Sequence, residues 1–163
     1  MKIRPANVSD QQRLVQLIAE FRVELARLRG ETHRVNLEAA GEELVEYQAQ
    51  GFPIYVAESD DATVEGYLVC RVAGNVVWAE SLYVRPEYRR RGVGSSLYAE
   101  AERLAQELGS DAPYNWVHPN NDRIVRFLQK RGYTVLNLIE LRRPRAGEKT
   151  ARKIRVGKHE FSH

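Results

Sequence analysis

The sequence predicts one α/β domain organised around a mixed β-sheet. Two observations support this: apolar residues recur at helical spacing along the chain, and short apolar runs bounded by turn residues lie between these segments. With 163 residues, the chain is long enough to bury about two-thirds of its unfolded surface without cross-links. Hydrophobic residues make up 43% and charged residues 29%, a composition typical of a globular protein.

The N-terminal half predicts two helices among four strands. A helix begins at Ser9, with Gln12 as its capping-box partner, and apolar residues at helical spacing continue it to Gly30. A second helix over 36–50 ends at Gly51. The strands are expected at 1–4, 53–58, 64–73 and 76–84, the last two joined by a tight Gly-Asn turn.

The C-terminal half predicts two more helices and two more strands. The helices are expected over 95–108 and 122–131, each followed by a glycine, and the strands over 114–117 and 133–141. The resulting order is β-α-α-β-β-β-α-β-α-β. It predicts a mixed central sheet of about six to seven strands, with about four helices packed on both faces.

The stretch EYRRRGVGSS, residues 87–96, joins the strand over 76–84 to the helix over 95–108. The start of a helix leaves several backbone N–H groups without intrahelical partners and carries a partial positive charge. Gly92 and Gly94 let an anion approach that backbone, and three arginines add charge for more than one phosphate group. The stretch therefore favours a pyrophosphate, although the chain contains no G-x-x-x-x-G-K-[ST] phosphate loop.

Two segments resemble motifs of the GNAT superfamily of N-acetyltransferases. The stretch ESLYVRPEYRRRGVGSSLYAEAERLA is similar to the central motif, Gln/Arg-x-x-Gly-x-Gly/Ala, which Arg89, Gly92 and Gly94 satisfy. The stretch NNDRIVRFLQKRGY resembles the next motif, in which an Asn opens a short helix that ends in Gly and an aromatic residue. The resemblance covers residues 1–141 and implies a GNAT-like fold, with the sheet splayed at its central strands to hold acetyl-CoA.

The resemblance also implies where acetyl-CoA binds. Its pyrophosphate would lie on the loop at 89–95, and its pantetheine arm would contact the main chain of the strand at 76–84. Asn121 would touch the cofactor further along. The residues expected to bind acetyl-CoA are Leu82, Tyr83, Val84, Arg89, Arg90, Arg91, Gly92, Val93, Gly94, Ser95 and Asn121.

Transfer of an acetyl group to an ammonium substrate requires a base, and the departing thiolate calls for an acid. Glu80 is the expected base, because many family members with a similar stretch carry a Glu there; the alternative is a strand carboxylate that is exposed or paired with an arginine. The acid stays open, since Leu128 stands where the family commonly has a Tyr. The proton donor to the thiolate is another side chain or a water molecule, or the thiolate leaves without being protonated. The candidates by position are Tyr83, Tyr114 and His118.

The expected reaction is direct attack, in a ternary complex, by a primary amine that belongs to a small cationic molecule, a peptide or a protein. In the family, the first two helices and their connection form one wall of the acceptor cleft. Here that region carries Glu31, Glu38, Glu42, Glu43 and Glu46. These carboxylates either favour a cationic acceptor or form the solvated faces of two helices. An alternative function, supported by Leu128, is an acyl-CoA-binding sensor or interaction module with weak or no catalysis.

The sequence predicts a domain over 1–145 followed by a basic extension over 146–163. Residues 142–163 hold 8 Lys and Arg against 2 Asp and Glu, whereas residues 1–141 hold 17 against 20. The slightly acidic body and the scarcity of aromatic residues in the tail argue against nucleic acid as the partner. Alternation at 153–156 predicts a strand or hairpin that pairs with a sheet edge and helps to form a homodimer; the alternative is a free tail that binds an acidic partner.

The remaining composition predicts a soluble protein in a reducing cytoplasm. No run approaches the roughly 20 apolar residues of a membrane span, and the N-terminus lacks the apolar core of a signal peptide. The single cysteine, Cys70, lies in an apolar run and is expected to be a buried strand residue. The four histidines are not paired at ligand spacing, so no catalytic metal is expected.

Overall fold

The computed structural model describes residues 1–148 and 152–163. The chain forms two compact units, Met1–Trp116 and Val117–His163. Each unit is described by itself below. Residues 149–151, which belong to the expected C-terminal extension, lie outside the described residues.

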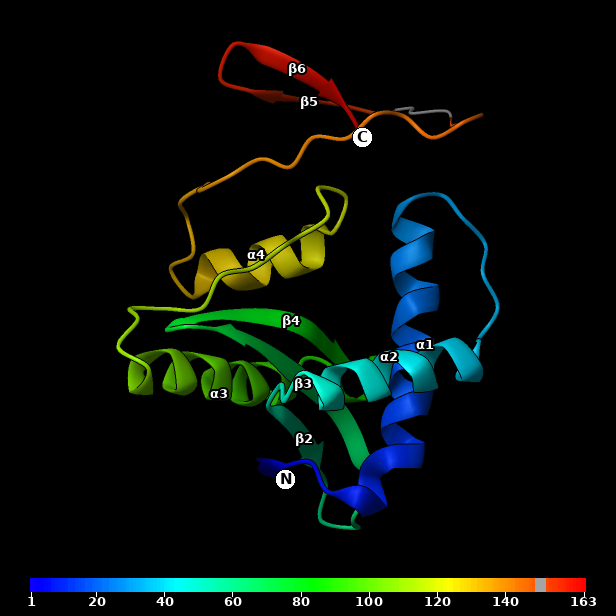
Figure 1. Cartoon of the computed structure of the whole chain (residues 1–163), viewed down its shortest axis with the longest axis vertical. Helices are drawn as coiled ribbons and strands as arrows, with labels where there is room; N and C mark the ends of the chain where they lie inside the picture. The colour runs from blue at the N-terminus through cyan, green and yellow to red at the C-terminus, as the bar shows by residue number, and fades with distance from the viewer. Residues whose placement is uncertain (149–151) are drawn as a thin grey trace. The chain divides into compact units, whose positions relative to one another are not determined.

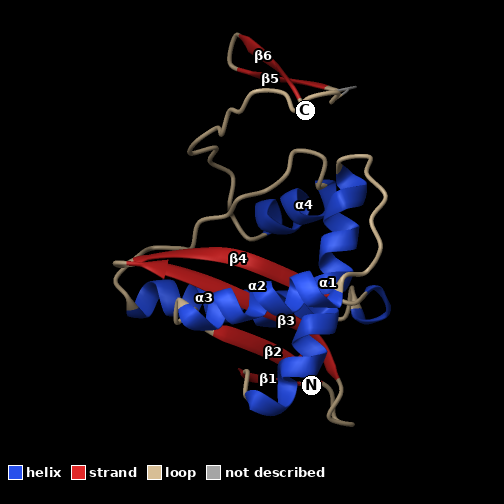
Figure 2. Ribbon diagram, turned by 45° about the vertical axis from the view of Figure 1, so that its right-hand side comes forward, coloured by secondary structure: helices blue, strands red, loops and turns tan. Residues whose placement is uncertain are grey.

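The first unit contains a four-stranded antiparallel sheet. Its strands are β1 (Lys2–Pro5), β2 (Ile54–Glu58), β3 (Val64–Ala73) and β4 (Val76–Val84), and they lie in the order β1-β2-β3-β4. Figure 2 shows these strands in red. Because β4 stands at the end of this order, one of its edges is open to pairing with something other than β3.

Three α-helices cover the two faces of this sheet: α1 (Gln11–Leu28), α2 (Leu37–Ala49) and α3 (Val93–Glu107). Leu17 of α1 and Leu44 of α2 belong to one buried apolar cluster, together with Tyr67 of β3. Leu97 of α3 belongs to a second cluster with Cys70 of β3. Since neighbouring strand residues point to opposite faces, α1 and α2 lie on one face and α3 on the other.

The start of the first helix differs from the expectation at Ser9. A short 3-10 turn, η1 (Val8–Asp10), precedes α1. The capping box is formed by Asn7, whose side chain accepts from Ser9 N–H, and Asp10, whose carboxylate accepts from Asn7 N–H. Asn7 takes the role because it has the extended backbone and short side chain of an N-cap residue.

The second unit contains α4 (Asp122–Lys130) and a hairpin of β5 (Lys153–Val156) and β6 (His159–Ser162). The expected extension therefore does contain a hairpin, with Ile154 opposite Phe161. Its two strands pair with each other and form a separate two-stranded sheet.

The prediction of six to seven strands in one sheet is wrong. Over 114–117, only Tyr114 makes a bridge, pairing with Trp78 in the parallel sense. Over 133–141, the described chain forms no strand, and several apolar side chains there are exposed. Apolar alternation identifies a segment suited to a sheet, but a strand also needs a partner edge, which sequence periodicity does not supply.

None of the helices in the described part of the chain combines the length and the apolar character needed to cross a membrane.

Candidate active site

A β-bulge places Glu80 at an irregular point of β4. The register pairs Val69 with Ser81 and Cys70 with Ala79, so Glu80 has no opposite residue on β3. Such a bulge bends its strand and re-aims the extra residue. Glu80, the expected base, therefore lies at the middle of β4 but outside its regular ladder of paired residues.

The surroundings of Glu80 come from α2. Burial raises the pKa of Tyr47, and the nearby carboxylates of Glu43 and, more weakly, Glu80 act in the same direction. Glu80 therefore lies within electrostatic reach of the Tyr47 phenol. Its Oε2 atom is buried and accepts no hydrogen bond from any described residue. A buried carboxylate oxygen without a donor is suited to receive one from a ligand.

Beyond the bulge, β4 presents alternate main-chain groups to its open edge. Arg85 N–H donates to the carbonyl of Glu65 at 3.0 Å. Because every second residue of an antiparallel strand directs its main-chain groups to the same neighbour, those of Tyr83 also face β3. Leu82 and Val84 face the other way. Within residues 1–116, no segment pairs with β4 past Ala79, where Tyr114 makes the last backbone contact.

The predicted main-chain contacts are therefore not equivalent. Leu82 has its main-chain groups on the open edge of β4. The carbonyl of Val84 is on that edge too, but it accepts a hydrogen bond of 2.6 Å from Arg89 Nε. Tyr83 contributes its main chain to the sheet and its ring to the core, 5.5 Å from the ring of Phe21.

The start of α3 has the backbone expected of an anion site. Gly92 is the N-cap residue, with a left-handed φ of 86° and no side-chain cap. Among the described residues, no acceptor is bonded to the N–H groups of Val93, Gly94 and Ser95, whereas Ser96 N–H already donates to the Gly92 carbonyl. Three adjacent donors thus remain at the positive end of a 15-residue helix.

Neighbouring packing fixes this helix start. Val93 is buried in the cluster on the α3 face of the sheet. A Cβ atom on Gly94 would lie 3.8 Å from the side chain of Val84, in ordinary contact, while one on Gly92 would meet nothing within 4 Å. Within that distance, the space beside Gly92 is therefore free of side chains from elsewhere in the described chain.

The three arginines of the loop divide into two kinds. Arg89 is directed inward: its Nη2 donates to Glu24 at 2.6 Å, and its guanidinium carbon lies 5.4 Å from the centre of the Tyr83 ring. Arg90 and Arg91 are exposed. Arg89 thus ties the loop to α1, which leaves the other two to attract an anion from solution.

Of the acid candidates, two lie in the first unit. The Tyr83 hydroxyl donates to Glu20 at 3.5 Å, and burial, reinforced by Glu20, raises the pKa of Tyr83. Tyr114 is exposed beside the ring of Trp78. The Tyr83 phenol therefore carries its proton at neutral pH.

The other predicted residues lie in the second unit. His118 Nδ1 accepts from Asn120 N–H at 3.1 Å. Asn121 is the N-cap of α4, its side chain accepting from Ile124 N–H at 3.3 Å, and Leu128 is buried. Asn121 thus opens the helix as expected.

Sequence reasoning missed the polar groups that flank Glu80. Arg22 pairs with Glu43, and its Nη2 lies 3.1 Å from the Tyr47 hydroxyl. The buried hydroxyls of Tyr67 and Ser81 are 2.8 Å apart. Tyrosines at helical or strand spacing indicate only a buried face, so nothing local in the sequence marks these contacts.

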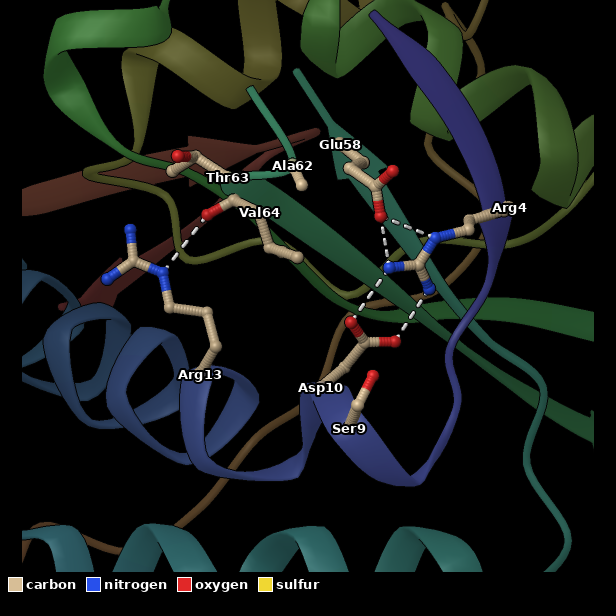
Figure 3. A pocket seen from close by; sticks show the side chains of 8 residues that line it. All are labelled: Arg4, Ser9, Asp10, Arg13, Glu58, Ala62, Thr63 and Val64. Atoms are coloured by element: carbon tan, nitrogen blue, oxygen red, sulfur yellow. Dashed lines mark hydrogen bonds and ion pairs between the residues drawn. The ribbon is translucent and has the colours of Figure 1, made fainter. Parts of the chain in front are cut away.

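A cavity of about 370 Å³ elsewhere in the first unit contains none of the predicted site residues. Figure 3 shows Arg4 lying between two carboxylates there. It donates to both oxygens of Asp10, at 2.7 and 2.9 Å, and through Nε to Glu58 at 2.7 Å. Because Arg4 is bonded to both carboxylates, the cluster is a structural link between β1, β2 and the start of α1.

Comparison with known proteins identifies the family of this chain. A model of the acetyltransferase (GNAT) family matches residues 19–133, more than half of the chain. The chain belongs to this family. The GNAT resemblance of its two motifs is thereby confirmed.

Two curated relatives match part of the chain. Over 93 residues it is 27% identical to spermidine N(1)-acetyltransferase of Thermoplasma acidophilum, a match covering 57% of this chain and 58% of that protein. Over 86 residues it is 30% identical to a putative phosphinothricin acetyltransferase of Bacillus subtilis, covering 50% and 53% respectively. The matches thus span little more than half the length of either relative.

A solved structure confirms the fold. The PaiA N-acetyltransferase of Thermoplasma acidophilum, in complex with coenzyme A, aligns with a TM-score of 0.67 at 21% identity, over 80% of this chain and 87% of that one. At this identity the likeness is one of architecture.

Proposed function

We propose that this protein is an N-acetyltransferase that moves the acetyl group of acetyl-CoA to a primary amine by direct attack in a ternary complex. The observation that carries the proposal is the set of three unbonded N–H groups at the start of α3, which follows the strand bearing the Glu80 bulge. A pyrophosphate needs such a helix start, and acyl transfer to an amine needs a base such as Glu80.

Each part of the site has a role in this proposal. The N–H groups of Val93, Gly94 and Ser95 bind the pyrophosphate, with Arg90 and Arg91 adding positive charge. The pantetheine arm lies along the open edge of β4, where Leu82 offers its main-chain groups. Asn121 remains an expected contact further along the cofactor.

The reaction begins when Glu80 accepts a proton, directly or through water, from the substrate ammonium. The freed nitrogen lone pair attacks the thioester carbonyl carbon, the attacking nitrogen loses its extra proton to solvent, and the C–S bond breaks as the tetrahedral intermediate collapses. The thiolate takes up a proton from water or from a phenol such as Tyr83 or Tyr114. The products are an N-acetylated amine and free coenzyme A.

The glutamates of the α1–α2 region are largely engaged by other groups. Glu43 pairs with Arg22, Glu31 lies 3.0 Å from Arg29, and Glu46 accepts from Gln50. Glu38 and Glu42 are exposed. Few unpaired carboxylates therefore remain to attract a cationic acceptor. The chemical class of the acceptor has to be inferred from other residues.

Turnover of acetyl-CoA over a panel of amines and peptides, read as thiol release, tests the proposal. We expect release that depends on the amine. Binding of acetyl-CoA without release for any amine would instead favour the acyl-CoA-binding module, for which Leu128 at the family's usual Tyr position is the supporting observation.

A further inference from the structure

Four side chains gather on one side of the sheet next to Glu80. They are Arg71 of β3, Trp78 of β4, and Tyr114 and Trp116 of the segment that bridges to β4. The ring of Trp78 lies 6.0 Å from that of Tyr114 and 6.1 Å from that of Trp116. The Arg71 guanidinium carbon is 5.3 Å from the centres of both indole rings.

This cluster lies on the face of the sheet that α1 and α2 cover. The residues next to Arg71 and Trp78 along their strands pack in the buried cluster on the α3 face of the sheet. They are Cys70, Val72, Val77 and Ala79. Alternation along a strand puts Arg71 and Trp78, which are direct cross-strand partners, on the opposite face. Tyr47, the neighbour of Glu80, belongs to that same face.

Arg71 carries a charge that the described protein does not balance. Its guanidinium makes no hydrogen bond or ion pair with any described residue. Four arginines near this sheet, by contrast, each meet a carboxylate: Arg4, Arg22, Arg85 and Arg89. A guanidinium against ring faces keeps its N–H donors at its edge, where a planar oxyanion can bind two of them at once.

The separation from Glu80 sets the size of a ligand that would reach both groups. Glu80 follows Trp78, the cross-strand partner of Arg71, by two residues. Two residues of regular strand span roughly 7 Å, and the bulge at Glu80 bends the strand within this span. An oxyanion held at Arg71 would therefore lie within a short carbon chain of an amine held at Glu80.

We infer that the acceptor is a zwitterion whose oxyanion binds Arg71 against Trp78 and Trp116 while its primary amine is delivered to Glu80. This inference rests on the proposed acetyltransferase function and narrows it to amino acids or amino phosphonates with a few carbons between amine and acid. The indoles hold the guanidinium in place, and they offer apolar surface to the connecting carbons because Trp116 is 63% exposed.

Selectivity over a matched panel of acceptors tests the inference. The acceptors are 4-aminobutanoate, 6-aminohexanoate and 3-aminopropylphosphonate, each compared with an alkylamine of equal length and with 1,4-diaminobutane. We expect kcat/KM for at least one zwitterion to exceed that of its alkylamine about 10- to 100-fold, the factor that a hydrogen bond to a charged group supplies. The phosphonate arm distinguishes the two kinds of oxyanion.

Variants at Arg71 locate the source of the preference. Arg71→Gln should collapse the ratio between zwitterion and alkylamine through a higher acceptor KM, and Arg71→Lys should retain part of it. Arg103→Gln is the matched control, because Arg103 is an exposed arginine on α3 paired with Glu100 and Glu107. It should leave the ratio as in the wild type.

Binding can also be read without turnover. The chain has only two tryptophans, and both belong to this cluster. Titration with the preferred zwitterion should change the intrinsic fluorescence of the wild type and of Arg103→Gln, and should leave that of Arg71→Gln unaltered.

The outcomes separate this inference from the proposed function. Thiol release with alkylamines and diamines at rates equal to or above those with zwitterions would overturn the inference and leave the acetyltransferase standing. A zwitterion preference that survives in Arg71→Gln would overturn the role of Arg71. Release with no amine at all would refute the proposed function itself.

Discussion

Glu80 stands apart from the other carboxylates of the sheet because its bulge leaves one oxygen buried and without a donor. If it is the base, Glu80→Gln should lower kcat at neutral pH by about 10²- to 10⁴-fold, with acetyl-CoA affinity within a few-fold of the wild type. The loss should shrink as pH rises, because more of the acceptor amine is then already neutral. Steady-state kinetics from pH 6 to 10 would check this.

The control for that experiment is Glu107→Gln, since Glu107 is an exposed carboxylate paired with Arg103 on α3. It removes the same charge on the α3 side of the sheet, opposite to the face that carries Tyr47, and should not alter the pH profile. A loss at Glu80→Gln of equal size at every pH would assign Glu80 a structural role instead.

Cys70 is fully buried, and burial raises the pKa of its thiol to about 12. Because the thiolate is the reactive form, the native protein should react with Ellman's reagent at pH 8 orders of magnitude more slowly than a free thiol does. One thiol per chain should react once the protein is unfolded in guanidinium. Rapid reaction of the native protein would show that β3 opens readily. A silent Cys70 also keeps an assay of released coenzyme A free of background.

At the scale of elements, the start of α3 depends on Gly92. Gly92→Glu would add strain of about 1–2 kcal/mol at a left-handed residue and place a negative charge beside the three free N–H groups. We expect acetyl-CoA binding to weaken by at least about 2 kcal/mol in calorimetry, because the carboxylate competes with the pyrophosphate.

Gly109→Glu controls for the strain of that variant. Gly109 also has a left-handed φ, 79°, with nothing within 4 Å of an added Cβ, but it follows the opposite end of α3. It should be destabilised to a similar degree and keep its acetyl-CoA affinity. Undiminished affinity in Gly92→Glu would show that the pyrophosphate lies elsewhere.

The link between β1 and the start of α1 predicts a dependence of stability on pH. The hydrogen bonds from Arg4 lower the pKa of Asp10, a side chain that is 4% exposed. Its stabilising effect is fully present above its unfolded pKa, about 3.9, and is lost as pH falls through the lower folded value.

Asp10→Asn should therefore cost about 1–3 kcal/mol of unfolding free energy at pH 7, measured by urea denaturation, and less at pH 2. Asp111→Asn is a suitable control, because Asp111 is an exposed carboxylate after α3 that makes no hydrogen bond or ion pair with any described residue. A cost at Asp10 that is the same at both pH values would contradict the role of its charge.

Elements whose evidence is local were predictable from the sequence, and contacts across the chain were not. Periodicity and glycines located the helices, and the Arg-Gly stretch located the unbonded start of α3. The bulge at Glu80 depends on the register of β4 against β3, which sequence periodicity does not define. Likewise, the ion pair of Arg89 with Glu24 spans 65 positions, so its side chain could not be assigned inward from sequence.

At the scale of the molecule, charge and apolar exposure are both unevenly distributed. Residues 117–163 hold 12 Lys and Arg against 4 Asp and Glu, which leaves 13 against 18 for residues 1–116. The run over 133–141 exposes five large apolar side chains: Val135, Leu136, Leu138, Ile139 and Leu141. An apolar surface of this kind in a folded protein marks an interaction site.

The hairpin β5–β6 also carries apolar side chains. Ile154 and Phe161 are cross-strand partners on one face of a sheet of only two strands. A two-stranded hairpin is marginally stable alone in water, so packing or pairing with another sheet must contribute to its stability. We expect the apolar run and the hairpin to be covered when two copies of the chain associate.

Light scattering on three forms of the protein tests this expectation. The intact chain should have the mass of a dimer at micromolar concentration, and deletion of residues 146–163 should lower both the mass and the melting temperature by removing the hairpin. Leu138→Lys should weaken the dimer as well, because it places a charge among side chains that association would bury. Leu138 is 81% exposed, so this variant should fold normally.

The deletion and the substitution report separately on the hairpin and the run. A dimer that persists in both forms with unchanged stability would show that neither segment joins the subunits, and a monomeric intact chain would mean that these surfaces await a different partner.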